Sequence, residues 1–165
     1  MIALRLVRLI ESHSDELTEK LVNKLLVDPR THDMHRVPAT ELRERIHELL
    51  QHLSDWLLNK TTSDIESKYV ALGRRRSSQG VSLADFSWSF MKTKEHLWAF
   101  LQREGFLLNA VELYGELELL RLLDQFFDRA LCFAIQGYEL QRPAHTASRA
   151  QTNDNTAVSA NAVRS

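Results

Sequence analysis

The sequence predicts an all-α fold, a single bundle of about five helices. Apolar residues recur at helical spacing in five long stretches, and no stretch alternates polar and apolar residues as a half-buried strand would. Only 5 Gly and 3 Pro occur in 165 residues, which favours long regular elements joined by few turns. With 44% hydrophobic residues, the chain has enough apolar side chains for one core.

The first part of the chain is predicted to form two helices. One covers residues 2–27, ends at Asp28-Pro29, and carries an apolar stripe of Leu6, Leu9, Ile10, Leu17, Leu21 and Leu25. Residues 28–40 are polar and hold two prolines, so we expect a loop there. The second helix is expected at residues 41–58, with the stripe Leu42, Ile46, Leu49, Leu53 and Trp56.

The third helix is expected at residues 63–79, where Ser63 and Glu66 have the spacing of a capping box. Its last turn carries three consecutive arginines, Arg74, Arg75 and Arg76. Cations suit the C-terminal end of a helix dipole, so a solvated helix end is one interpretation. The other is a contact for an anion or a protein partner, with Arg74 and Arg76 as the candidates, because Arg can fork onto a carboxylate.

The fourth helix is expected at residues 83–103 and should meet the third at a fixed angle. Gly80 can adopt the positive φ that closes a helix. Ser82 can cap the next helix, and Asp85, three residues later, can complete a reciprocal capping box with it. Gly105 is the expected stop of the fourth helix.

Lys94 and Glu95 point, by helical spacing, into apolar surroundings. Lys94 shares its face with apolar residues, and Glu95 shares another with Trp88 and Trp98. Burying an unpaired charge is costly, so one interpretation is that both side chains reach outward to water. The other is that they line a pocket or join an internal ion pair with Arg76, which would mark a ligand-sensing cavity.

The fifth and longest helix is expected at residues 109–140 and is apolar over much of its circumference. Such a helix is either central in the fold or shared with a second subunit, so we expect a homodimer. Beyond Arg142 the composition changes to Ala, Ser, Thr, Asn and Gln without aromatics. We therefore expect a helical domain over residues 1–141 and a disordered tail over residues 142–165.

Composition and charge argue against several classes of protein. A net charge of −1 and a pI near 6.7 give no overall attraction to nucleic acid. No apolar run reaches the roughly 18 residues that a membrane span needs. The N-terminus lacks a signal peptide, and the single Cys132 suits a reducing compartment, so we expect a cytoplasmic protein without membrane partners. No nucleophile stands beside a base, so an enzyme is not expected.

The seven histidines form no metal-binding motif, and neither a metal nor a cofactor is expected. His96 falls with Asp85, Ser89 and Lys92 on what the spacing predicts to be the solvent side of the fourth helix, whereas a haem ligand needs an apolar face. His13 lies on the apolar stripe of the first helix, where a buried neutral histidine is the expected state.

One stretch resembles a known family. The run LGRRRSSQGVSLADFSWSFMKTKEHLW is similar to the pattern of the RsbRD N-terminal domain family, through Leu72, Gly73, Arg76, Gly80, Ser82 and Leu83, and more loosely through Phe90, Leu97 and Trp98. The segment ELELLRLLDQFFDRALCFAIQGYE also resembles the last helix of such domains. The chain departs from the pattern at Lys94, where an Arg is expected.

The resemblance implies a sensory or regulatory input domain. Such domains occur in co-antagonists of the stressosome, before a phosphorylatable output domain, and at the front of some bacterial histidine kinases. Related stressosome sensors have a globin-like fold without haem and dimerise through their helices. We expect this chain to act without an output domain of its own, as a non-enzymatic sensor or adaptor that binds a protein partner or a ligand. The alternative is a haem-binding globin-like gas sensor.

Overall fold

The structure, a computed structural model, describes residues 2–104 and 110–142. These residues form α1 (Ile2–Ser12), α2 (Ser14–Val27), the 3₁₀ helix η1 (Pro29–Arg36), α3 (Ala39–Gln51), α4 (Leu53–Leu58), α5 (Thr62–Ser78), α6 (Leu83–Glu104) and α7 (Ala110–Gln141). No strand occurs among them, so the all-α class is confirmed, but about five helices is wrong because eight are present in this part of the chain. Gly105 and residues 143–165 of the predicted tail lie outside the described residues.

Two of the predicted helices are each divided by one residue. The chain leaves helical geometry at His13 (φ −108°, ψ 17°), which separates α1 from α2. A second break at His52 (φ −118°, ψ 27°) separates α3 from α4. Apolar residues on both sides of each break stay buried, so the spacing of apolar residues does not reveal the breaks.

The segment predicted as a loop contains the helix η1. Asp28 caps it by accepting a hydrogen bond from the Arg30 N–H at 2.8 Å, and Pro29 occupies its first turn. The Thr31 hydroxyl is buried and donates to the Leu25 carbonyl at 2.6 Å. The segment is therefore tied to the end of α2.

The predicted corner before α6 is confirmed, while the start of α5 differs from the prediction. The capping box of α5 is formed by Thr61 and Asp64, two residues before the predicted pair. Gly80 has a φ of 74°. The Asp85 N–H donates to the Ser82 hydroxyl at 3.1 Å, and that hydroxyl donates to the Asp85 carboxylate at 2.9 Å.

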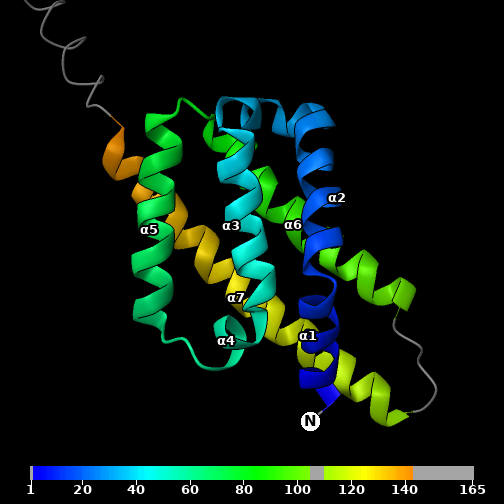
Figure 1. The fold of residues 1–165 in the computed structure, drawn as a ribbon. Helices are drawn as coiled ribbons and strands as arrows, with labels where there is room; N and C mark the ends of the chain where they lie inside the picture. The colour runs from blue at the N-terminus through cyan, green and yellow to red at the C-terminus, as the bar shows by residue number, and fades with distance from the viewer. Residues whose placement is uncertain (1, 105–109, 143–165) are drawn as a thin grey trace, which may run out of the picture.

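The helices form two layers, with α2, α3 and α5 in front and α6 and α7 crossing behind them (Figure 1). Two glycines bring α5 and α7 into backbone contact. A Cβ atom added to Gly73 would lie 1.9 Å from the Ala134 carbonyl oxygen, and one added to Gly137 would lie 2.0 Å from the Val70 carbonyl oxygen. In contrast, α3 and α5 are not among the helix pairs whose backbones approach closely.

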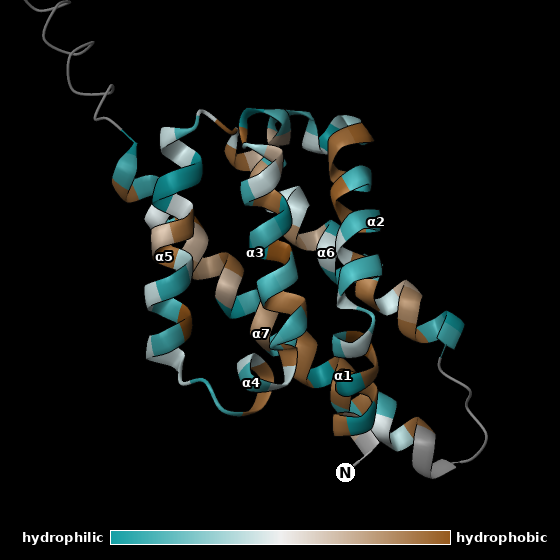
Figure 2. Ribbon diagram, viewed as in Figure 1, coloured by the Kyte–Doolittle hydropathy of each residue, from teal (hydrophilic) through white to brown (hydrophobic). Residues whose placement is uncertain are grey.

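The core lies between the two layers, and hydrophilic residues are frequent along the front helices α2, α3 and α5 (Figure 2). The buried residues of this core include the aromatic side chains of Trp56, Phe86, Phe90, Phe100, Phe126 and Phe127. Of the helices within 2–104 and 110–142, none combines the length and apolar character that a membrane crossing requires.

We predict that Gly73→Ala destabilises the fold. The added methyl group would overlap the backbone of Ala134, so α5 and α7 must separate, and we expect the free energy of unfolding to fall by about 2–3 kcal/mol. This loss should exceed the gain in helix propensity, which is about 1 kcal/mol. Urea unfolding of the variant measures it, with the exposed Ser67→Ala of the same helix as control. A Gly73→Ala variant as stable as the parent would contradict the close crossing.

Candidate functional site

Arg76 is the most deeply buried charged residue of α5. It follows Tyr69 and Gly73 on the buried face of that helix, and its side chain is only 3% exposed. Its Nη1 donates to the Glu41 carboxylate at 2.6 Å and to the Gln79 side-chain oxygen at 2.7 Å. A buried guanidinium needs such partners, and Glu41 of α3 supplies the opposite charge.

Glu41 is the centre of this polar cluster. Arg75 holds it with two hydrogen bonds, Nε to Oε1 at 2.7 Å and Nη2 to Oε2 at 2.6 Å, and the Gln79 amide adds a third at 3.1 Å. The hydrogen bond from Arg75, followed by that from Arg76, holds the pKa of the Glu41 carboxyl far below its usual range, although partial burial opposes the shift. The cluster joins the start of α3 to the end of α5.

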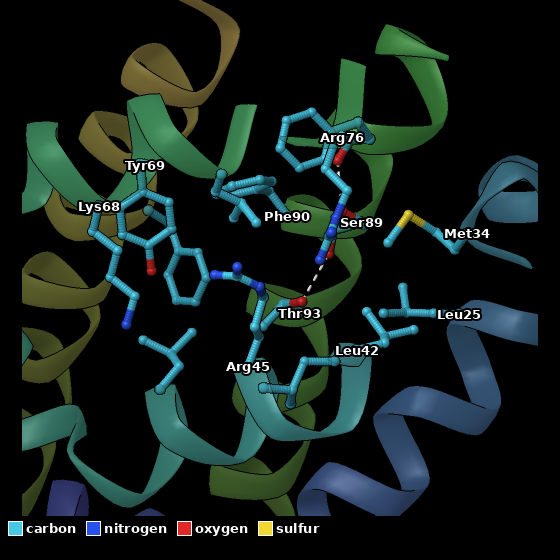
Figure 3. Close-up of a pocket in the computed structure, with 15 residues that line it drawn as sticks. Leu25, Met34, Leu42, Arg45, Lys68, Tyr69, Arg76, Ser89, Phe90 and Thr93 are labelled. Atoms are coloured by element: carbon cyan, nitrogen blue, oxygen red, sulfur yellow. Dashed lines mark hydrogen bonds between the residues drawn. The ribbon is translucent and has the colours of Figure 1, made fainter. Parts of the chain in front are cut away.

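A cavity of about 80 Å³ lies beside this cluster, between α3, α5 and α6 (Figure 3). Its walls are mostly apolar and aromatic, with contributions from Met34, Leu42, Tyr69, Leu72, Phe90 and Phe127. Arg76 extends into it from α5 and Arg45 from α3, on opposite sides of the space (Figure 3). The hydroxyls of Ser89 and Thr93 also border it, but each donates to a backbone carbonyl of its own helix.

The cationic side chains of the cavity are incompletely satisfied. The Nε of Arg45 is buried and lacks a hydrogen-bond partner, because Glu41 Oε1, at 3.4 Å, completes an ion pair but no hydrogen bond. In Arg76 only Nη1 is used, so Nε and Nη2 have no acceptor among the described residues. Lys68 pairs with Glu48, and its Nζ lies 4.2 Å from the centre of the Trp56 ring.

Positive charges outnumber negative ones around the cavity. Arg45, Lys68, Arg75 and Arg76 surround it or its cluster, whereas Glu41 and Glu48 are their acidic partners. Burial lowers the pKa values of Arg76 and Lys68, and the charge of Arg45 lowers both further. A negatively charged group in the cavity would reduce this repulsion.

The other predicted site residues lie elsewhere. Arg74 is exposed, and Lys94 reaches outward to Asp124 of α7, with Nζ and Oδ1 3.1 Å apart. The Glu95 side chain is 62% exposed and lies near Lys92. Arg76 pairs with Glu41, whereas Lys94 pairs with Asp124 and Glu95 with Lys92, so the interpretation in which Lys94 and Glu95 join an internal ion pair with Arg76 is wrong.

Trp88 and Trp98 do not line the cavity either. Both are half-buried, and Trp88 stacks under the guanidinium of Arg30, whose Cζ lies 4.8 Å from the ring centre. Arg76 is therefore the one predicted site residue that the structure places at the cavity. The sequence analysis missed Arg45, Glu41 and Lys68, because their positions in the sequence pattern are those of ordinary solvent-exposed charges.

The prediction that His96 faces solvent is wrong. It is 7% exposed, with Nε2 3.1 Å from the Leu17 carbonyl oxygen and Nδ1 3.1 Å from Lys24 Nζ. The carbonyl requires a proton on Nε2, so Nδ1 accepts from the lysine. Burial, followed by the charge of Lys24, lowers the pKa of His96. Both ring nitrogens are engaged, which leaves neither free to ligate haem iron.

The comparisons identify the family. The family model described as the RsbT co-antagonist protein rsbRD N-terminal domain matches residues 15–152, most of the chain. The chain belongs to the RsbRD N-terminal domain family. No curated protein matches it, and no solved structure does. The predicted resemblance is thus confirmed, and the chain is a stressosome-related signalling domain. The RsbRD match continues past residue 141, where the sequence analysis ends the domain.

We predict that Glu41→Gln lowers the free energy of unfolding by about 2–3 kcal/mol at neutral pH, because it leaves buried Arg76 without a counter-charge. The folded-state pKa of Glu41 lies below its ordinary 4.5, so its contribution is present above pH 4.5 and is lost as the pH falls below that value. Urea unfolding at neutral and at acidic pH should show that the free energy of unfolding falls less on acidification in the variant than in the parent. Glu44→Gln, an exposed change on the same helix, is the control. Identical acid profiles for Glu41→Gln and the parent would contradict this role.

We also predict a second pH effect, from His96. A histidine whose folded-state pKa is depressed contributes stability that is present above its ordinary pKa of 6.5 and decreases as the pH falls below it. His96→Gln should flatten the stability profile between about pH 7.5 and about pH 5.5. The exposed His32→Gln should leave the profile unchanged. A profile in His96→Gln as steep as in the parent would show that His96 is not buried neutral.

Proposed function

We propose that this chain is a non-enzymatic sensor or adaptor domain of a bacterial stress-response pathway, which acts by binding protein partners. The family match over residues 15–152 is the observation that supports it, since the family is named for co-antagonists of RsbT. The target proposed here is accordingly an RsbT-type protein. The residues of the site fit this function because their charges are held in structural pairs, and none stands as a nucleophile beside a base.

The first turns of α7 offer a surface for self-association. Leu113, Tyr114 and Leu117 are 47%, 76% and 55% exposed, and their spacing places them on one side of the helix. This end of α7 reaches beyond the front layer of helices, at the lower right of Figure 1. Large exposed apolar side chains gathered on one helix are typical of protein interfaces. They support a homodimer formed through the first turns of α7.

For the dimer, we predict that Leu117→Glu converts the protein to a monomer without loss of fold, because a charge would be buried at the interface. Light scattering after size exclusion, at about 100 µM protein, measures the mass, and circular dichroism checks the fold. Leu140→Glu is the matched control, since Leu140 is 67% exposed at the opposite end of the same helix. A parent protein that is monomeric at this concentration would contradict the dimer.

For the partner, we predict saturable binding of the purified chain to the RsbT-type protein of the same cell, measured by calorimetry with the other antagonist proteins present. Dimerisation and partner binding can be separated by repeating the titration with Leu117→Glu. Absence of binding by the folded, dimeric parent chain would contradict the proposed target. Turnover of any added substrate by the purified chain would contradict the non-enzymatic assignment.

A further inference from the structure

We propose that the cavity between α3, α5 and α6 binds a small monocarboxylate with a short apolar body, held by the guanidinium groups of Arg45 and Arg76. This goes beyond the proposed function, because it gives the domain a chemical input that its protein contacts do not require. The site uses residues of the described chain alone, and it differs from the exposed end of α7 proposed as the dimer surface.

The hydrogen-bond donors of the cavity point to an acceptor that comes from outside the chain. Arg45 Nε is buried without a hydrogen bond, 3.4 Å from Glu41 Oε1, although the Arg45 side chain as a whole is 40% exposed. Arg76, whose side chain is 97% buried, lines the cavity and makes both of its hydrogen bonds through Nη1. A buried donor without a hydrogen bond is costly, and a carboxylate can accept from two guanidinium groups at once.

The charge balance selects an anion over a neutral acceptor. Arg45 is close enough to Arg76 and Lys68 to disfavour the charged form of both, and Glu41 is already shared among Arg75, Arg76 and Gln79. A neutral ligand could accept hydrogen bonds but would leave this repulsion in place. A single negative charge between Arg45 and Arg76 would offset it.

The walls and the size restrict the rest of the ligand. Tyr69, Leu72, Phe90 and Phe127 present aromatic and aliphatic surface, and the Ser89 and Thr93 hydroxyls are committed to backbone carbonyls. The volume of about 80 Å³ corresponds to roughly the bulk of two or three water molecules, which suits a body of a few carbon atoms. A bulky or highly polar anion such as a nucleotide does not fit these walls.

The position of the site links the ligand to the arrangement of the helices. Charged pairs connect α3 to α5 beside the cavity, namely Glu41 with Arg75 and Arg76, and Glu48 with Lys68. A carboxylate bound to Arg45 of α3 and Arg76 of α5 would add a further connection across the same gap. Binding is therefore expected to stabilise the α3–α5 pair.

The test is a titration of the ¹⁵N-labelled full chain with butyrate, followed by NMR through the Arg45 Nε–H signal and the backbone amides. We expect saturation with a Kd of about 1 mM or tighter, and movement of the Arg45 signal as it gains an acceptor. Butanol has the same body without the charge, and inorganic phosphate has the charge without the body. Both should bind at least about tenfold more weakly than butyrate.

Three variants locate the site. Arg45→Gln should weaken butyrate binding by about tenfold or more, because it removes one charge-assisted contact. Arg43→Gln is the matched control: it removes the same charge from the same helix, but Arg43 pairs with Glu19 and does not line the cavity. Ser89→Leu fills the cavity and should abolish binding while the chain stays folded. Arg76 is not changed, because its pair with Glu41 supports the fold.

Several outcomes would overturn the proposal. No saturation by butyrate in the folded parent chain is one, and equal binding of butanol or phosphate is another. Unchanged binding in Arg45→Gln or in Ser89→Leu would place any bound anion elsewhere. Because the titration uses the chain alone, its failure leaves partner binding untouched, and a failure to bind the RsbT-type protein leaves this site untouched.

Discussion

The close crossing of α5 over α7 determines where the rest of the domain can go. Gly73 has no side chain, so α5 packs directly on the backbone of Ala134. Gly137 likewise lets α7 pack directly on the backbone of Val70. A helix seated this way has its rotation fixed, and residues four before and three after Gly73 must share its buried face. Those residues are Tyr69 and Arg76. The crossing thus directs a guanidinium into the interior, where an opposite charge is needed.

The same crossing explains why a polar site lies between α3 and α5. Since α5 packs on α7, its backbone stays apart from α3, and side chains fill the space between them. Glu41 accepts a hydrogen bond from Arg76 in this space, and the part that side chains leave unfilled is the cavity. Two helices that are connected by charged side chains can adopt alternative arrangements of similar energy more readily than two helices whose backbones are in contact. That property suits a regulatory domain, whose proposed role is to change its contacts and not to perform chemistry.

Local features were predictable from the sequence, and features that depend on distant partners were not. Gly80, Ser82 and Asp85 lie within six positions, so the corner they form follows from turn and cap chemistry. Glu41 and Arg76 are 35 positions apart, and no local pattern pairs them. The buried face of α6 was misread for another reason: Ser89 and Thr93 count as polar, yet each donates to its own helix backbone and can then pack inside, and His96 follows them.

The measurement that tests this account most directly is a set of backbone proton NOEs on the folded chain in solution. The account predicts contacts between the Gly73 Hα protons and the backbone of Ala134 and Tyr138, with matching contacts between Gly137 and Val70. It predicts no regular series of backbone contacts between α3 and α5. Backbone NOEs running along α3 and α5, with none between Gly73 and α7, would contradict it.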